Sequence, residues 1–162
     1  LALANPQDSF IGLELRYKRL VLAAKKIERQ NIQNILLMRE RGQFIDEYLP
    51  QKSMDCMHIN FPDPWSKKAR RKHRILSAEF LSKMHPHFRS KGELRFKTDH
   101  LEYFETVTDI LQDLKTYTII EHTTDLHRSE YNENNILTEF EMLFKSKENP
   151  PIGFLRAEVL QK

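Results

Sequence analysis

Apolar and polar residues follow two different spacings along the chain. Residues 17–30 show helical spacing, with apolar side chains at Leu20, Ala23, Ala24 and Ile27. Short apolar runs bounded by polar residues indicate strands between such helices. The patterns predict helices over residues 17–30, 44–49, 77–88, 101–114 and 138–146, and strands over residues 9–15, 34–40, 54–61, 92–99, 117–123 and 154–161.

Three local signals refine this prediction. Residues 1–4 have the character of a helix end, because the following Asn5-Pro6 pair disfavours continuation of a helix. Ser77 is the predicted N-cap of the helix that follows it. Residues 123–135 have no periodicity, and we expect a polar loop there.

Strands that alternate with helices predict an α/β sandwich with a mostly parallel sheet. Ligands of such folds bind at the carboxyl ends of the strands. Carboxylates stand at three of these predicted ends: Glu14, Asp63 and Asp99. Each of them could instead cap a helix, but the presence of all three indicates a functional site.

The composition is typical of a globular domain. The 162 residues are 40% hydrophobic and 30% charged, so we expect one domain over residues 1–162. Apolar runs are too short to span a membrane. The single cysteine, Cys56, cannot form an intramolecular disulfide, which favours a reducing, cytoplasmic location. Cys56 could be a catalytic thiol, although buried cysteines are common on core strands.

Positive charge is concentrated in one basic segment, residues 66–74. The chain carries 26 basic and 23 acidic side chains, a net charge of +3. The basic segment alone contains six lysines or arginines and no acidic residue, so the rest of the chain is net acidic. Solvated helical faces usually mix both signs. A cluster of one sign therefore favours a defined polyanion as partner.

The residues before the basic segment read Phe61-Pro62-Asp63-Pro64-Trp65; we call residues 61–65 the motif loop. The two prolines restrict the backbone around Asp63 and prevent helix formation. A carboxylate held there can accept hydrogen bonds from the N1–H and N2–H₂ groups of guanine. Trp65 could stack on a base, or it could pack in the core and anchor the loop.

The stretch NFPDPWSKKARRKHR at residues 60–74 resembles the signature of the tRNA (guanine-N7)-methyltransferase family. The similarity continues through GELRFKTD, TEFE and RAEV, in the family's order and over nearly the whole chain. The resemblance implies a Rossmann-like class I methyltransferase fold, S-adenosylmethionine as cofactor and tRNA as partner. It implies that the enzyme methylates N7 of a variable-loop guanine, with no metal and no membrane partner, as a monomer or a homodimer.

The resemblance also implies roles for individual residues. Asp63 matches the active-site aspartate, which also borders the methyl donor. Glu14 matches the acidic residue that holds the ribose hydroxyls of S-adenosylmethionine. The position beside the adenine falls on Glu40 or Arg41, depending on the direction of counting. Glu40 is preferred, because a cation beside the adenine amino group is unfavourable.

The remaining matches concern the RNA substrate. The TEFE segment matches residues that close over the substrate, although Thr138 and Glu141 could also form a plain capping box. Lys67 and Asp99 match positions that contact tRNA or guanine. The substrate-binding and tRNA-binding residues implied by the resemblance are Lys67, Ala69, Arg70, Arg71, Lys72, His73, Arg74, Asp99, Thr138, Glu139, Phe140 and Glu141.

The glycines depart from the family pattern. The chain has four glycines, at positions 12, 42, 92 and 153, and no Gly-x-Gly loop. In the family this loop follows a central strand, which lies between the strands that match residues 9–15 and 54–61. Without that strand, two half-sheets would have unpaired central edges. We therefore expect this sequence to lack the first strand and glycine loop, and a segment to precede it in the natural protein.

Two other functions remain open from the sequence. A non-catalytic RNA-binding relic of a methyltransferase would keep the basic segment and lose cofactor binding; it would bind tRNA with a steep salt dependence. A metal site could use His85 with His87, or His122 with Asp125 and His127. The second alternative is the weaker one, because clustered cysteines and a helical histidine pair are both missing.

Overall fold

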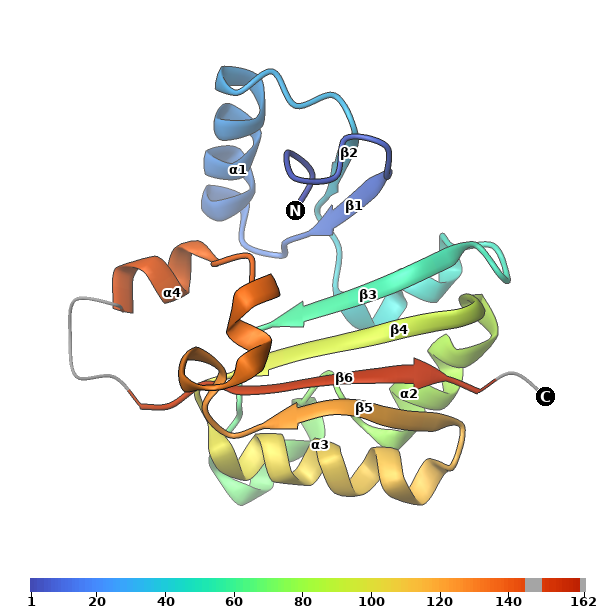
Figure 1. The fold of residues 1–162 in the computed structure, drawn as a ribbon. Helices are drawn as coiled ribbons and strands as arrows, with labels where there is room; N and C mark the ends of the chain where they lie inside the picture. The colour runs from blue at the N-terminus through green and yellow to red at the C-terminus, as the bar shows by residue number, and fades with distance from the viewer. Residues whose placement is uncertain (145–149, 161–162) are drawn as a thin grey trace. The chain divides into compact units, whose positions relative to one another are not determined.

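The structure is a computed structural model that describes residues 1–144 and 150–160. It divides into two compact units, Leu1–Tyr48 and Leu49–Lys162, which are considered separately below (Figure 1). Within the described residues, no helix is both long and apolar enough to cross a membrane.

The first unit is a parallel β-α-β arrangement. Strand β1 (Phe10–Leu13) pairs in parallel with β2 (Ile35–Met38), and α1 (Tyr17–Arg29) connects the two. The 3₁₀ helix η1 (Gly42–Glu47) follows β2. Residues 1–8 are held by one side chain, because Asn34 Nδ2 donates to the carbonyl oxygens of Ala2, Asn5 and Asp8 at 2.8–3.1 Å.

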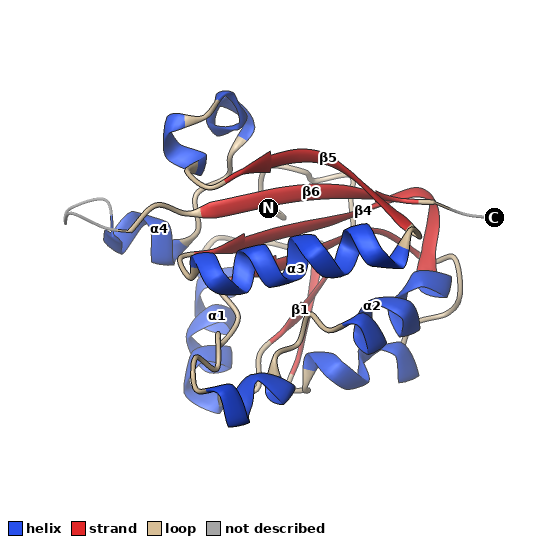
Figure 2. Ribbon diagram, turned by 90° about the horizontal axis from the view of Figure 1, so that it is seen from below, coloured by secondary structure: helices blue, strands red, loops and turns tan. Residues whose placement is uncertain are grey.

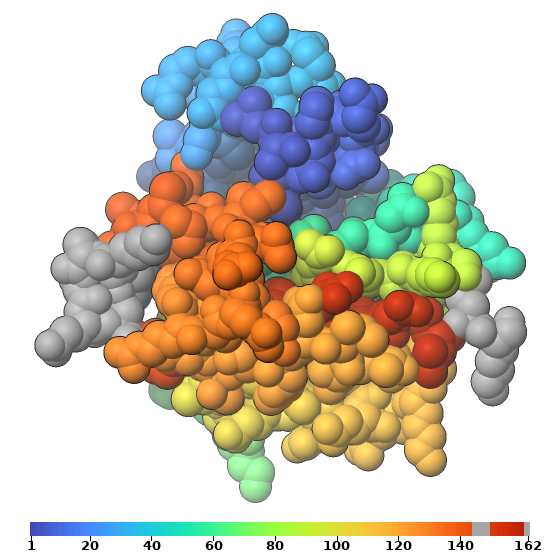
Figure 3. Space-filling view, viewed as in Figure 1, coloured from blue at the N-terminus to red at the C-terminus, as the bar shows by residue number. Residues whose placement is uncertain are grey.

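The second unit contains a four-stranded sheet with the order β3-β4-β6-β5. Strand β3 (Met54–Asn60) is parallel to β4 (Phe88–Thr98), whereas β6 (Gly153–Val159) is antiparallel to both β4 and β5 (Tyr117–Thr123). Helices α2 (Ala78–Met84) and α3 (Leu101–Leu114) lie on one face of this sheet (Figure 2). Between β5 and β6 come η4 (Leu126–Arg128), η5 (Glu130–Asn134) and α4 (Glu139–Phe144), which Figure 3 shows in orange on the surface of this unit.

The two faces of the four-stranded sheet differ in polarity. Leu94, Phe96 and Leu155 are fully buried on one face, as the period-two pattern requires, and Phe96 packs there on the Tyr103 and Phe104 rings of α3. On the opposite face Arg156 forms ion pairs at 2.7 Å with Glu93 on β4 and Glu121 on β5. Charged cross-strand pairs of this kind fix the register of neighbouring strands.

Most predicted elements are confirmed, and the differences have local causes. The helix over residues 101–114 and the strand over residues 117–123 match α3 and β5. Ser77 is confirmed as an N-cap, since its hydroxyl accepts a hydrogen bond from Phe80 N at 3.2 Å. Where a helix end was predicted, residues 2–4 form a single turn, in which Asn5 N donates to Leu1 O at 3.1 Å, the i to i−4 bond of a helical turn. The loop prediction for residues 123–135 missed η4 and η5, which lack apolar periodicity. The last two residues of the helix predicted over residues 138–146, and the last residue of the strand predicted over residues 154–161, lie outside the described residues.

Candidate active site

The motif loop leaves the carboxyl end of β3 in a constrained conformation. Phe61 N donates to Lys97 O at 2.8 Å, which ties the start of the loop to β4. Phe61 and Trp65 have positive φ angles of 49° and 43°, a region that non-glycine residues rarely adopt. Between them the Asp63 carboxylate is exposed and makes no hydrogen bond or ion pair with any described residue.

A second loop follows the neighbouring strand β4 and contains Asp99. Its carboxylate is half-buried and, within residues 1–144 and 150–160, also lacks a polar partner. The next residue, His100, is the N-cap of α3, and its Nδ1 accepts a hydrogen bond from Tyr103 N at 3.2 Å. Its Nε2 therefore carries the proton and donates to Ser66 Oγ at 3.1 Å. This bond joins the Asp99 loop to the residue that follows the motif loop.

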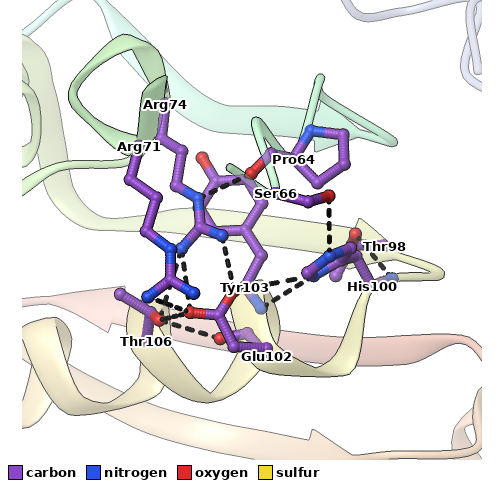
Figure 4. Close-up of polar contacts among 9 residues, drawn as sticks. All are labelled: Pro64, Ser66, Arg71, Arg74, Thr98, His100, Glu102, Tyr103 and Thr106. Atoms are coloured by element: carbon purple, nitrogen blue, oxygen red, sulfur yellow. Dashed lines mark hydrogen bonds and ion pairs between the residues drawn. The ribbon is translucent and has the colours of Figure 1, made fainter. Parts of the chain in front are cut away.

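The guanidinium of Arg74 lies between the motif loop and α3 (Figure 4). Its Nε donates to Pro64 O at 2.7 Å, and its two terminal nitrogens donate to the Glu102 carboxylate at 2.5 and 3.3 Å. The same guanidinium lies over the Tyr103 ring, 4.5 Å from its centroid. Hydrogen bonds from Arg74 lower the pKa of Glu102. We call Arg74, Pro64, Glu102 and Tyr103 the Arg74 clamp.

The burial of Arg74 differs from that of the other cations in the basic segment, and the expected tRNA contact of Arg74 stays a prediction. Only 5% of its side chain is exposed, so its donors are directed into the protein. Arg71 also pairs with Glu102, at 3.0 Å, but 45% of its side chain remains exposed. Arg74 is therefore a structural member of the basic segment.

Most of the basic segment is exposed: residues 66–73 face solvent. It forms the 3₁₀ helix η2 (Lys68–His73) after Lys67. His73 is exposed, and its ring centroid lies 5.4 Å from that of Trp65. Ala69 is also exposed. The exposed cations whose side chains make no hydrogen bond or ion pair with described residues are Lys67, Lys68, Arg70 and Lys72.

The TEFE segment at the start of α4 is built around a buried carboxylate. Thr138 and Glu141 form a capping box, in which Thr138 N donates to Glu141 Oε2 at 2.8 Å and Glu141 N donates to Thr138 Oγ1 at 3.1 Å. The Glu141 side chain is 0% exposed. The carboxylate of Glu141 therefore faces the interior, and the substrate contact that the resemblance implies for Glu141 stays a prediction.

Three residues that the sequence analysis did not place in the site surround Glu141. Lys97 Nζ lies 3.2 Å from Glu141 Oε2, while His127 Nε2 and Asn135 Nδ2 lie 3.2 and 3.1 Å from Oε1. Burial disfavours the charged carboxylate, but hydrogen bonds from Thr138 and Asn135 and the charge of Lys97 lower the pKa of Glu141 to about 2. Burial lowers the pKa of Lys97, and Glu141 opposes this shift.

An aromatic contact joins TEFE to the motif loop. The rings of Phe140 and Phe61 have centroids 4.4 Å apart and are tilted by 37°. Phe140 is half-buried, whereas Glu139 is exposed. The loops of Asp63 and Asp99 thus meet at the carboxyl ends of β3 and β4 through the Ser66–His100 hydrogen bond, and TEFE contacts the motif loop through Phe140.

The first unit carries two further predicted carboxylates at strand ends. Glu14 follows β1, and its Oε1 accepts a hydrogen bond from Arg16 N at 2.7 Å. Glu40 follows β2, and its carboxylate accepts hydrogen bonds from Arg41 N at 2.6 Å and Tyr48 Oη at 3.1 Å. Because β1 and β2 are parallel, both carboxylates lie at the same edge of this two-stranded sheet. Arg41 itself is exposed.

The surroundings of Cys56 and of the histidines bear on two alternatives from the sequence, a catalytic thiol and a metal site. Cys56 Sγ lies 3.3 Å from His58 Nε2, and burial raises the pKa of this thiol to about 11, which removes its nucleophilic form at neutral pH. His85 and His87 contact the carbonyl oxygens of Leu160 and Pro50. Among the described residues, no group of three histidine, cysteine or carboxylate side chains is suited to hold a metal ion.

Comparisons with protein families and curated sequences agree with one another. A family model described as "Putative methyltransferase" matches residues 1–152. A bifunctional glycosyltransferase/methyltransferase from Fusobacterium nucleatum is 44% identical over 155 residues, covering 96% of this chain and 24% of that protein. A tRNA (guanine-N(7)-)-methyltransferase from Mycoplasma pneumoniae is 36% identical over 145 residues, covering 88% of this chain and 69% of that protein. The chain thus spans a quarter of the first relative and about two thirds of the second.

Solved structures with a similar fold are also methyltransferases. An rRNA methylase from Streptococcus thermophilus has a TM-score of 0.61 at 15% identity, covering 94% of this chain and 74% of that chain. A SAM-dependent O-methyltransferase from Thermotoga maritima has a TM-score of 0.56 at 12% identity, covering 95% of this chain and 51% of that chain. At these identities the comparison supports the predicted Rossmann-like α/β fold alone.

Proposed function

The chain belongs to the tRNA (guanine-N7)-methyltransferase family, and from this premise we propose that the protein methylates N7 of a variable-loop guanine in tRNA. S-adenosylmethionine, when bound, would supply an electrophilic methyl group. The observation that carries the proposal is the motif loop. It presents Asp63, a carboxylate without a partner among the described residues, directly before a basic segment with four exposed, unpaired cations.

The reaction suits a site that positions charge. Guanine N7 has a lone pair and no proton, so its attack on the methyl carbon needs no general base. The N7–C bond would form as the C–S bond breaks, so positive charge would develop on the purine that the carboxylate of Asp63 faces. We assign to Asp63 the acceptance of hydrogen bonds from N1–H and N2–H₂, which become more acidic as the purine becomes cationic. Asp99, also unpaired among the described residues, would contact the same base.

The carboxylates of the first unit supply hydrogen-bond acceptors of the kind that S-adenosylmethionine requires. Glu14 uses Oε1 for the Arg16 amide, and its Oε2 makes no hydrogen bond with a described residue. That oxygen would accept hydrogen bonds from ribose hydroxyls. Glu40 is held by Arg41 N and Tyr48 Oη, and the lone pairs left on its carboxylate would accept from the adenine amino group.

Replacing Glu14 with glutamine is expected to weaken S-adenosylmethionine binding about tenfold, because a charged acceptor of two hydroxyls becomes neutral. Titration calorimetry with S-adenosylmethionine measures this effect on the full natural polypeptide. Glu133, an exposed residue without a polar partner among the described residues, supplies the control Glu133→Gln. Equal affinities of the Glu14→Gln variant and the unmodified protein would contradict the assigned role.

The exposed part of the basic segment is expected to bind the tRNA backbone. Log K for tRNA binding falls as log salt rises, and a double Arg70→Met, Lys72→Met variant should reduce the magnitude of this slope by about 1–2. With fewer phosphates neutralised, fewer counterions are released on binding. The measurement is tRNA binding between low and moderate salt, with the exposed Lys18→Met on α1 as control. An unchanged slope in the double variant would remove the basic segment from the tRNA interface.

The activity itself is tested with the full natural polypeptide, unmodified tRNA and S-adenosylmethionine that carries a labelled methyl group. Digestion of the tRNA to nucleosides should give labelled 7-methylguanosine, and sequencing of the labelled fragment should locate it in the variable loop. Salt-sensitive tRNA binding without methyl transfer or S-adenosylmethionine affinity would instead identify an RNA-binding relic. Label in another nucleoside would reject the proposed specificity.

A further inference from the structure

We propose that Arg74 positions the motif loop for methyl transfer and does not contact tRNA, an inference that rests on the proposed function. Arg74 belongs by sequence to the basic segment. Its geometry separates it from the other cations there, because the Arg74 clamp uses its donors inside the protein. The clamp thus gives this arginine a role in catalysis that its position in the sequence does not reveal.

Burial provides the first part of the argument. A cation that neutralises a phosphate must reach solvent, where the nucleic acid approaches. Only 5% of the Arg74 side chain is exposed, and its charge is already balanced by Glu102 at 2.5 Å. Arg70, in contrast, is exposed and has no polar side-chain partner among the described residues. Removing the charge of Arg70 should therefore change the salt dependence of tRNA binding, whereas removing the charge of Arg74 should not.

The attachment points of the clamp provide the second part. Arg74 Nε binds Pro64 O at 2.7 Å, directly after Asp63 in the chain, and His100 binds Ser66 Oγ at 3.1 Å. Trp65 lies between these two attachments with a φ of 43°. Such a backbone conformation is unfavourable for a non-glycine residue and persists only when its surroundings hold it. The clamp is one of the contacts that hold it.

Glu102, the partner of Arg74, also helps to position Asp99, the second carboxylate without a polar partner among the described residues. Glu102 lies in the first turn of α3, three residues after Asp99. The Arg74–Glu102 pair therefore connects the loop of Asp63 to α3, whose N-cap His100 directly follows Asp99. A guanine bound by both carboxylates would require this relative placement, since small displacements of positioning groups cost large factors in rate.

The clamp requires arginine specifically. One planar guanidinium reaches Pro64 O, both oxygens of Glu102 and the face of the Tyr103 ring. A lysine ammonium has the same charge but cannot make this set of contacts at once. A phosphate contact would tolerate lysine, whereas the clamp should not. Arg74→Lys therefore distinguishes the two roles.

The first measurement does not depend on activity. Trp65 is the only tryptophan of the sequence, so its fluorescence reports on the motif loop alone, provided that the full natural polypeptide has no other tryptophan or has any other replaced by phenylalanine. Arg74→Lys, Arg74→Met and Glu102→Gln should each make Trp65 more accessible to acrylamide in the absence of tRNA. Arg70→Met should leave the quenching constant unchanged. Circular dichroism verifies that each variant is folded.

The second measurement uses methyl transfer and tRNA binding. Arg74→Lys and Glu102→Gln should lower kcat by up to about 10²-fold, the loss found when a positioning group is displaced by about 1 Å, and leave the salt slope of tRNA binding unchanged. Arg70→Met should reduce the magnitude of that slope by about 0.7–0.9. Breaking the exposed ion pair Arg89–Asp55 with Arg89→Met provides a control variant with unchanged kcat.

Two results would overturn the proposal. One is a reduced salt slope in Arg74→Met together with full kcat in Glu102→Gln, since removal of an acidic residue cannot abolish a phosphate contact. The other is unchanged Trp65 quenching in both Arg74→Met and Glu102→Gln. If the unmodified protein transfers no methyl group, the proposed function fails, and the quenching data alone still show whether the clamp holds the loop.

Discussion

Replacing Asp63 with asparagine is expected to lower kcat/KM for methyl transfer to tRNA by about 10²–10³-fold, the loss found when one preorganised electrostatic group is removed. Asparagine keeps the shape of the side chain but removes the negative charge that faces the purine as it becomes cationic. Its NH₂ group would also face the N1–H and N2–H₂ donors of guanine, where it cannot accept a hydrogen bond.

The same substitution should leave the fold intact. The Asp63 carboxylate is exposed and makes no polar contact with described residues, so its loss should change the free energy of unfolding by less than about 0.5 kcal/mol. Initial rates with labelled S-adenosylmethionine and chemical denaturation measure the two effects. Asp109→Asn, at an exposed position of α3, is the matched control. Retention of more than a tenth of the activity by Asp63→Asn would rule out the electrostatic role.

Local patterns were sufficient to predict most of the secondary structure. The apolar stripe of residues 101–114 and the alternating residues 117–123 lie on α3 and β5, because each element buries one face against the same core. The 3₁₀ helices η4 and η5 were missed because a polar segment gives no periodic signal. Asn34, which binds three backbone carbonyls of residues 1–8, illustrates a long-range contact that no local pattern contains.

The sequence was sufficient to find most residues of the candidate site, but only in part to predict what each side chain does. Asp63 and Asp99 were found because they stand at strand ends, and both are unpaired among the described residues. Arg74 and Glu141 were grouped with substrate contacts, although both side chains are buried. Charge along a sequence does not reveal burial. The partner of Arg74 lies 28 positions away and that of Glu141 44 positions away.

Replacing Glu141 with glutamine is expected to destabilise the protein by about 3 kcal/mol. Glutamine can still accept the hydrogen bond from Thr138 N, but it leaves the buried ammonium of Lys97 without an opposite charge. Adding Lys97→Met to Glu141→Gln should restore part of the loss, because the unpaired charge is then removed as well. Glu133→Gln, on the neighbouring η5, is the exposed control.

The pH dependence of stability tests the same carboxylate. The pKa of Glu141 is lowered from 4.5 to about 2 in the folded protein, so the folded state binds its proton less readily than the unfolded state. Its stabilising contribution is therefore complete above the ordinary glutamate pKa and is lost as the pH falls from about 4.5 to about 2. Denaturant midpoints measured across this range should converge for the unmodified protein and Glu141→Gln. A constant difference between them would show that the charge of Glu141 does not stabilise the TEFE segment.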